Sequence, residues 1–404
     1  MSGMDTRATS APAAGWLGDL ERALPEDGLS ATLVARIWDP AVEGPSVVAV
    51  RPDGLFDVTS AFPTVRDLCE EADPAAALAG TPGSRVGDAA DVLANTPRED
   101  RDPARPWFLA PVDLQAVKAA GVTFAVSMLE RVLEERARGD LDRAAALRSE
   151  ILAEIGTDLR SLRPGSPEAS RLKELLVAQG AWSQYLEVGI GPDAEIFTKC
   201  PPLAAVGTGE QAGVLASSTW NNPEPEVVLL VSSTGAIVGA SLGNDVNLRD
   251  VEGRSALLLP KAKDNNASCA LGPFLRLFDA GFDLDDVRST SVTLTIEGTD
   301  GFRLEAVSEL SQISRDPVDL VGQLLGPQHQ YPDGAALFLG TMFAPVVDRE
   351  AEGKGFTHHA GDVVTISAPL LGSLVNCIQT SESCAPWTFG TRALMRNLAR
   401  RGLS

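Results

Sequence analysis

Three carboxylates stand at the ends of one strongly apolar stretch of the sequence, WNNPEPEVVLLVSSTGAIVGASLGNDV, residues 220–246. Glu224 and Glu226 precede the apolar run, and Asp245 follows it. A Thr-Gly pair midway along predicts a two-residue turn between two antiparallel strands. In that register Glu224 lies directly opposite Asp245, and Glu226 shares their side of the sheet because side chains alternate along a strand. The three carboxylates are therefore expected to converge on one spot.

Such a cluster of carboxylates could bind a divalent cation. Three anionic groups close together repel one another unless a metal ion neutralises them. Because no cysteine or histidine joins them, we expect the oxygen-preferring ions Mg²⁺, Mn²⁺ or Ca²⁺ rather than Zn²⁺. The alternative interpretation places the two glutamates on a solvated strand end and lets Asp245 begin a turn. The residues by themselves leave both interpretations open.

The composition narrows the classes of partner. A chain of 404 residues, 44% of them hydrophobic, can bury a sizeable core. The 34 Lys and Arg against 55 Asp and Glu give a net charge of −21, which repels nucleic acid and anionic membrane surfaces. The five scattered cysteines form no C-x-x-C pair, and no segment has the composition of a secretion signal or a membrane span. We therefore expect a cytoplasmic protein that binds neither nucleic acid nor membranes.

The first part of the chain is expected to form a leader and a small domain. Residues 1–30 predict a flexible leader with helical character near residues 17–24. Residues 31–110 predict a small N-terminal α+β domain, in which two β-branched runs broken at Pro-Asp-Gly precede a short helix within residues 63–80. The Asp-, Pro- and Gly-rich stretch 81–105 predicts a surface loop at the domain boundary.

The rest of the chain, residues 111–404, predicts one larger catalytic domain. Its helical pattern begins near Met128 and Val132 and continues into a helical insertion over about residues 136–184, where Ser166 begins a further helix. From Tyr185 onwards short β-type runs separated by turn signals dominate. The expected fold class is mainly β with α: a β-rich core that carries helical elements.

Three segments around the predicted hairpin resemble motifs of the fumarylacetoacetate hydrolase family. PEPEVVLL is similar to its Glu-x-Glu element, GNDVNLRD to its Asn-Asp-x-(Ser/Asn)-x-Arg-Asp element, and KAKDNNASCALGPF to its Lys-x-x-(Asp/Asn)…Leu-Gly-Pro element. The resemblance extends from about residue 121 to the C-terminus, and residues 31–110 more loosely resemble the small N-terminal β domain of many members. It implies a mixed β-roll or β-sandwich core, Mg²⁺ bound by Glu224, Glu226 and Asp245, and assembly into homodimers or tetramers.

The helical region resembles one branch of this family. Hydrolytic members usually carry a histidine paired with a carboxylate on a mobile lid. Here His329, His358 and His359 all come late in the sequence. GVTFAVSMLERVLEE and YLEVGIGPDAEIFTK instead resemble the 2-keto-3-deoxy-D-arabinonate dehydratase branch, which implies that three residues there bind substrate: Ser127, Arg131 and Lys199.

This resemblance implies dehydration of a 2-keto-3-deoxy sugar acid, such as a pentonate converted to 2,5-dioxopentanoate. Chelation of the C1 carboxylate and C2 ketone by the metal would acidify the C3 hydrogens. Lys263 is the expected C3 base, with Lys261 as the neighbouring alternative and a surface salt bridge as the non-catalytic interpretation. Glu134 is the expected acid for the C4 hydroxyl, with Glu135 as its alternate, although glutamates on a charged helix are commonly solvated.

Four further residues are expected to contact substrate. Arg249 would bind a carboxylate or hydroxyl with its guanidinium, or alternatively tie down the exit of the hairpin. Asn266 stands where relatives often have aspartate. Gly340 and Thr341 end LFLGT, which is similar to the substrate-contacting Thr-Gly-Thr-Pro loop of the family.

Two other functions remain open on the sequence. One is hydrolysis of a C–C bond in a 2,4-diketo acid of the fumarylacetoacetate or acylpyruvate type, which the family as a whole favours and the late histidines oppose. The other is a non-catalytic acidic binding protein, in which Lys263 and Arg249 would have no chemical role.

Overall fold

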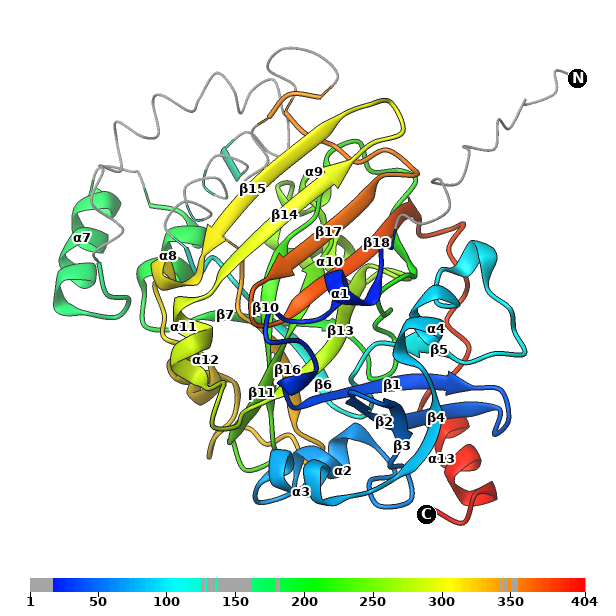
Figure 1. Ribbon diagram of the computed structural model, residues 1–404. Coiled ribbons are helices and arrows are strands. Elements are labelled where there is room, and N and C mark those ends of the chain that lie inside the picture. The colour runs from blue at the N-terminus through cyan, green and yellow to red at the C-terminus, as the bar shows by residue number, and fades with distance from the viewer. Residues whose placement is uncertain are drawn as a thin grey trace, which may run out of the picture.

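Two β-sheets that pack face to face dominate the protein (Figure 1). The computed structural model describes residues 17–124, 128, 132, 135–136, 162–178, 182–341, 343, 347–349 and 355–403. The large sheet has eleven strands in the order β4-β3-β2-β1-β13-β11-β10-β16-β6-β7, with β5 paired to β1. The smaller sheet has the order β15-β14-β17-β18-β8, and β9 pairs with β12 in a short ribbon.

The strand boundaries follow the β-type runs of the sequence. The large sheet contains β1 (Leu33–Asp39), β2 (Gly44–Arg51), β3 (Gly54–Asp57), β4 (Ser84–Gly87), β5 (Trp107–Leu109), β6 (Ala116–Gly121), β7 (Glu195–Cys200), β10 (Pro225–Val231), β11 (Ile237–Asp245), β13 (Cys269–Leu277) and β16 (Ala335–Phe338). The smaller sheet contains β8 (Gln211–Val214), β14 (Ser291–Glu297), β15 (Arg303–Glu309), β17 (Val363–Ala368) and β18 (Gly372–Thr380). The ribbon consists of β9 (Asn221–Asn222) and β12 (Asn247–Leu248).

Most of the described helices are short and cover the edges and outer faces of the sheets (Figure 1). They are α1 (Leu20–Ala23), α2 (Val65–Cys69), α3 (Pro74–Gly80), α4 (Ala89–Ala94), α7 (Pro167–Ala178), α8 (Gln184–Ile190), α9 (Arg249–Glu252), α10 (Leu259–Lys263), α11 (Leu284–Ser289), α12 (Pro317–Leu324) and α13 (Thr391–Arg400). The described residues also include the 3₁₀ turns Gly28–Ser30, Arg98–Asp100, Ala256–Leu258 and Leu310–Gln312. Across the described ranges, none of the helices has both the length and the apolar character needed to cross a bilayer.

The position of strand β10 in the large sheet explains why its sequence is apolar throughout. Val227, Leu229 and Val231 face the core between the two sheets, whereas Val228 and Leu230 face a second core on the opposite side of the large sheet. A strand buried on both faces carries a continuous rather than an alternating apolar run. Each such side chain contributes about 1.5–3 kcal/mol through burial.

The N-terminal segment shares the large sheet with the rest of the chain. β1 pairs with β13 through Leu33 opposite Arg276. Residues 17–30, which the sequence assigns to the leader, include α1 and bury Leu17 and Ala23. The Glu26 N–H also donates to the carbonyl of Pro369 at 2.7 Å. The described part of the leader is therefore packed against the core.

Two local predictions for this segment are wrong. The single helix expected within residues 63–80 is two helices, α2 and α3, because Thr64 and Asp73 each cap a new helix start. The stretch 81–105, expected to be loop, contains β4 and α4. Its apolar residues are few, but Val92 and Leu93 are buried and fix α4 against the core.

The helical segment in the middle of the chain forms its own small core. Met128 and Val132 are helical and buried, as their spacing predicts. They cluster with Leu176 of α7, Leu186 of α8 and Trp220. The Ser166 hydroxyl accepts a hydrogen bond from the Ala169 N–H at 3.1 Å, which confirms the predicted helix start.

Candidate functional site

The hairpin that carries the carboxylates has the predicted register. Pro225 lies opposite Asn244 and Glu226 lies opposite Gly243 in the β10–β11 ladder. The Asp245 N–H donates to the carbonyl of Glu224 at 3.0 Å. Glu224 and Asp245 therefore face each other across the hairpin as expected.

The predicted turn is wrong, although the register is right. Instead of a two-residue turn at Thr234 and Gly235, the chain loops over residues 232–236, and the Ser232 N–H donates to the Ala236 carbonyl at 2.9 Å. This longer loop shifts the pairing by one residue. A β-bulge between Leu230 and Val231 shifts it back, so the two irregularities cancel before the ladder reaches the carboxylates.

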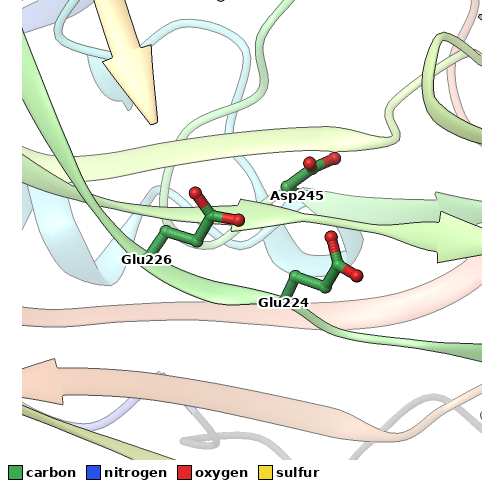
Figure 2. A group of neighbouring side chains, drawn as sticks. All are labelled: Glu224, Glu226 and Asp245. Atoms are coloured by element: carbon green, nitrogen blue, oxygen red, sulfur yellow. The ribbon is translucent and has the colours of Figure 1, made fainter. Parts of the chain in front are cut away.

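The three carboxylates converge at this end of the hairpin (Figure 2). One carboxylate oxygen from each of Glu224, Glu226 and Asp245 lies within 4.8 Å of the other two. All three side chains are buried, so the interpretation that placed the glutamates on a solvated strand end is wrong. An all-oxygen, anionic set of this kind suits a hard divalent cation.

Two lysines from separate elements enter the cluster. Lys263, at the end of α10, donates from Nζ to Glu224 Oε2 and, at 2.9 Å, to Asp245 Oδ2. Lys199, on β7, lies 2.8 Å from Asp245 Oδ1. Lys263 is buried whereas Lys261 is exposed, so the structure identifies Lys263 as the lysine at the cluster.

The carboxylates differ in their electrostatic environment. Burial, and then the like charges of Asp245 and Glu224, raise the pKa of Glu226 well above its ordinary range. Burial also opposes ionisation of Asp245, but the ammonium groups of Lys199 and Lys263 outweigh it and lower the pKa of Asp245. The repulsion at Glu226 is the kind that a bound cation would relieve. The donor set and its charge therefore fit a divalent ion.

The side chain of Lys199 is enclosed within the protein. Its side chain has no exposed surface, and its Nζ donates to the carbonyls of Val246, at 3.1 Å, and Lys263. Together with the contact to Asp245, these bonds use the three donors of an ammonium group. These contacts place Lys199 between Asp245 and the backbone of Lys263, and its expected role in binding substrate stays a prediction.

The predicted substrate loop lies against the cluster through its backbone. The Gly340 N–H donates to Glu226 Oε2 at 2.6 Å. Gly340 has φ +92°, and a β-carbon there would collide with the Thr123 hydroxyl, which itself donates to the Leu339 carbonyl at 2.7 Å. Thr341 is buried, and its hydroxyl accepts from the Phe343 N–H at 3.1 Å.

Arg249 and Asn266 have clear partners in the fold. Arg249, the first residue of α9, is buried, and its guanidinium carbon lies 4.4 Å from the centroid of the Trp220 ring. The Asn266 amide donates to the carbonyls of Ser381 at 3.1 Å and Ala385 at 3.0 Å. Asn266 thus anchors the C-terminal segment, and its predicted contact with substrate stays a prediction.

Asn266 also borders a separate cavity of about 240 Å³. Its walls include Trp38 of β1, Trp107 of β5, and Trp387 and Phe389 of the C-terminal segment, with Arg101 at its rim. Trp38 stacks on Trp107 with ring centroids 5.8 Å apart. Glu224, Glu226 and Asp245 are not among the residues that line this cavity, so it is distinct from the carboxylate cluster.

Several predicted site residues fall on parts of the chain that the structure does not describe. Ser127, Arg131 and Glu134 lie outside the described residues, so their roles stay predictions. Glu135 is described as helical and half-buried, and its role as the alternate acid stays a prediction as well.

The three histidines lie in other environments. His358 is buried, its Nδ1 lies 3.1 Å from Asp362 Oδ2, and its ring packs edge-on to Phe356. Burial lowers the pKa of His358. His359 is partly exposed and lies 3.4 Å from Asp300, while His329 is exposed and packs on Tyr331. These contacts give His358 a structural partner in Asp362.

Two known proteins are similar in sequence to this chain. The probable 2-keto-3-deoxyxylonate dehydratase of Haloferax volcanii is 26% identical over 339 residues, which are 83% of this chain and 95% of the relative. The 2-dehydro-3-deoxy-D-arabinonate dehydratase of Saccharolobus solfataricus is 30% identical over 185 residues, which are 46% of this chain and 58% of the relative. No protein-family model matches the chain.

Solved structures share the fold at lower identity. A 2-keto-3-deoxy-D-arabinonate dehydratase complexed with magnesium and 2,5-dioxopentanoate superimposes with a TM-score of 0.60 at 20% identity, covering 86% of this chain and 99% of that one. The fumarylacetoacetate hydrolase of Exiguobacterium antarcticum gives a TM-score of 0.52 at 15% identity, covering 87% of this chain and all of that one. The predicted resemblance and the mainly β fold with added helices are confirmed.

Proposed function

We propose that the protein is a divalent-metal-dependent dehydratase of a 2-keto-3-deoxy sugar acid. The proposal rests on one observation: three buried carboxylates lie together, and the buried Lys263 forms ion pairs with two of them. The two relatives with dehydratase names and the solved dehydratase that contains magnesium and 2,5-dioxopentanoate support it. A pentonate is the substrate we favour.

Glu224, Glu226 and Asp245 would hold the metal. We favour Mg²⁺ over Mn²⁺ or Ca²⁺ because the solved dehydratase of the same fold is complexed with magnesium. A divalent ion held there would supply Lewis-acid chemistry, which would draw electron density from the C1 carboxylate and C2 ketone of the substrate and acidify the C3 hydrogens. Lys199 keeps Asp245 and the Lys263 backbone in fixed relation. The Gly340 N–H holds Glu226 in the same way.

The neutral amine of Lys263 would remove one proton from C3 of the substrate. Glu134, or its alternate Glu135, supplies a proton to the C4 hydroxyl, which leaves as water while the C3–C4 double bond forms. The unsaturated keto acid then moves a proton from C5 to C3, which gives an enol with a C4–C5 double bond. The hydroxyl proton of this enol moves to C4, which gives the aldehyde of 2,5-dioxopentanoate. One water is lost and no redox partner is needed.

Hydrolysis of a 2,4-diketo acid is the competing activity. Hydrolytic members of the resembling family use a histidine with a carboxylate, but here His358 is held by Asp362 and lies beside core residue Phe356. The two activities separate in one assay of the purified protein with Mg²⁺. Release of 2,5-dioxopentanoate from a 2-keto-3-deoxypentonate supports the proposal, and cleavage of an acylpyruvate alone contradicts it.

We further propose that the enzyme works in the cytoplasm as a homodimer or as a tetramer built from two dimers. Its charge and scattered cysteines support the compartment, and closed symmetric assembly is the common state of such enzymes. A monomer by light scattering at micromolar concentration contradicts the assembly.

A further inference from the structure

The ladder that positions the carboxylates continues by one more pair of side chains. In the β9–β12 ribbon Asn222 lies directly opposite Asn247, and Asn221 lies opposite Leu248. This is the register of the β10–β11 ladder carried past Glu224 and Asp245. Asn222 stands two residues before Glu224, and Asn247 stands two residues after Asp245.

The two asparagines lie on the face that carries the carboxylates. Leu242, Val246 and Leu248 all belong to the core between the two sheets. Because side chains alternate along the strand direction, Asp245 and Asn247 point to the other side. The paired amides therefore extend the row of carboxylates by one step.

Both amides are buried and incompletely bonded. Asn247 has no exposed surface, and across the described chain neither its amide oxygen nor its amide nitrogen has a hydrogen-bond partner. Asn222 donates to the Pro223 carbonyl at 2.7 Å, but its amide oxygen has no partner among the described residues. Buried amide groups are costly to leave unpaired, and natural proteins rarely do so without a ligand or an ordered water.

A buried asparagine with a purely structural role looks different in this protein. Asn376 is equally buried, and its amide donates to the carbonyls of Gly207 at 2.9 Å and Glu210 at 3.0 Å. Two such bonds explain why an amide is needed there. The contacts within the described chain supply no comparable reason for an amide at Asn247.

We infer that Asn222 and Asn247 bind the hydroxyl groups of the substrate beyond C3, which makes them specificity-determining residues for hydroxylated 2-keto acids. A hydroxyl can donate to an amide oxygen or accept from an amide nitrogen, so two hydroxyls of a sugar acid can satisfy the two ends of an asparagine. The inference rests on the proposed function. In that same site, Asn222 and Asn247 would distinguish a hydroxylated sugar acid from a 2-keto acid that has no hydroxyl groups.

Calorimetric titration tests this inference without turnover. The Lys263→Met protein, which lacks the proposed base, is titrated in Mg²⁺ with a 2-keto-3-deoxypentonate and with 2-oxobutyrate, which has no hydroxyl. Adding Asn247→Leu is expected to weaken binding of the pentonate about 10–100-fold, since hydroxyls bound by the amide would be left unpaired. The same change should alter binding of 2-oxobutyrate less than about threefold.

Melting temperatures of the otherwise unchanged chain supply the matched control. Asn376→Leu removes a bonded amide and should lower the melting temperature, whereas Asn247→Leu removes unpaired polar atoms and should not lower it. Equal effects of Asn247→Leu on both keto acids, or on neither, overturn the inference, as does a loss of melting temperature equal to that of Asn376→Leu. If the Lys263→Met protein binds neither keto acid although it binds Mg²⁺, the proposed function is overturned and the inference with it.

Discussion

The Lys199 ammonium lies 2.8 Å from the Asp245 carboxylate, and both side chains are buried. The pair joins β7 to the end of β11, two strands that are not neighbours in the large sheet. Because Lys199 also donates to the Lys263 carbonyl, one side chain sets the spacing between the acidic cluster and the proposed base.

Replacing Lys199 by Met should therefore be severely destabilising. Removing one partner of a buried ion pair costs about 3–5 kcal/mol, and here it leaves Asp245 with Lys263 as its remaining cation among the described residues. Urea unfolding measures this loss. Lys173→Met is the control, because Lys173 pairs with Glu187 at the surface, where an ion pair contributes at most about 1 kcal/mol. Equal losses in the two variants would show that Lys199 is not a buried anchor.

Metal binding should depend on Glu226. Saturating Mg²⁺ at about one hundred times its Kd should raise the unfolding free energy by about 2.7 kcal/mol. Glu226→Gln should remove most of this increase and most of the turnover, yet leave the metal-free protein at least as stable, because it removes a carboxylate that burial and like charges disfavour. Glu168→Gln, at an exposed position of α7, should keep the full metal-dependent increase. An unchanged response in Glu226→Gln would argue against the cluster as the metal site.

The local pattern of the chain was sufficient to predict the centre of the fold. The β-type runs that became β10, β11, β14 and β17 lie where the sequence places them, and the register that brings Glu224 opposite Asp245 is correct. That success depended on a compensation. The loop over residues 232–236 and the bulge beside Leu230 each break the predicted hairpin, and only their combination preserves its register.

Long-range contacts account for what the sequence did not predict. Lys199 and Asn266 have residue types that suit substrate binding, but their observed contacts are with partners 46 or more positions away, such as Asp245 and Ser381. Nothing in the local pattern of β7 indicates that Lys199 is fully buried. The unpaired amide of Asn247 gave no local signal either, because satisfaction of a buried polar group is a property of the folded surroundings.

Acid should destabilise the protein in two steps through His358 and Asp362. Burial lowers the pKa of His358 below its ordinary 6.5. As pH falls, the unfolded chain therefore takes up a proton on this histidine at a higher pH than the folded chain does. The free energy of unfolding falls as pH drops below about 6.5. Burial opposes ionisation of Asp362, but Arg349 and His358 lower its pKa from 3.8 to about 2. Its contribution, about 2 kcal/mol, is present above pH 3.8 and lost as pH falls through about 2.

Unfolding free energies measured across this pH range separate the two groups. His358→Gln should abolish the first step and keep most of the second, since Arg349 still pairs with Asp362. Asp362→Asn should abolish the second step and lower stability near neutral pH. A His358→Gln protein with the wild-type decline between pH 6.5 and 5 would show that another group titrates there.

The identity of the C3 base can be tested on a substrate analogue that cannot be dehydrated. 2-Oxobutyrate has C3 hydrogens but no hydroxyl to lose, so their exchange with deuterated solvent requires the base and not the acid. Lys263→Met should retain Mg²⁺ and keto-acid binding, lose about 10²–10⁴-fold of turnover, and stop this exchange. Lys261→Met, which alters an exposed neighbour, should leave both rates near wild type. Exchange that persists in Lys263→Met and vanishes in Glu134→Gln would reverse the two assignments and make the carboxylate the base, since only the group that removes the C3 proton can control a reaction with no leaving group.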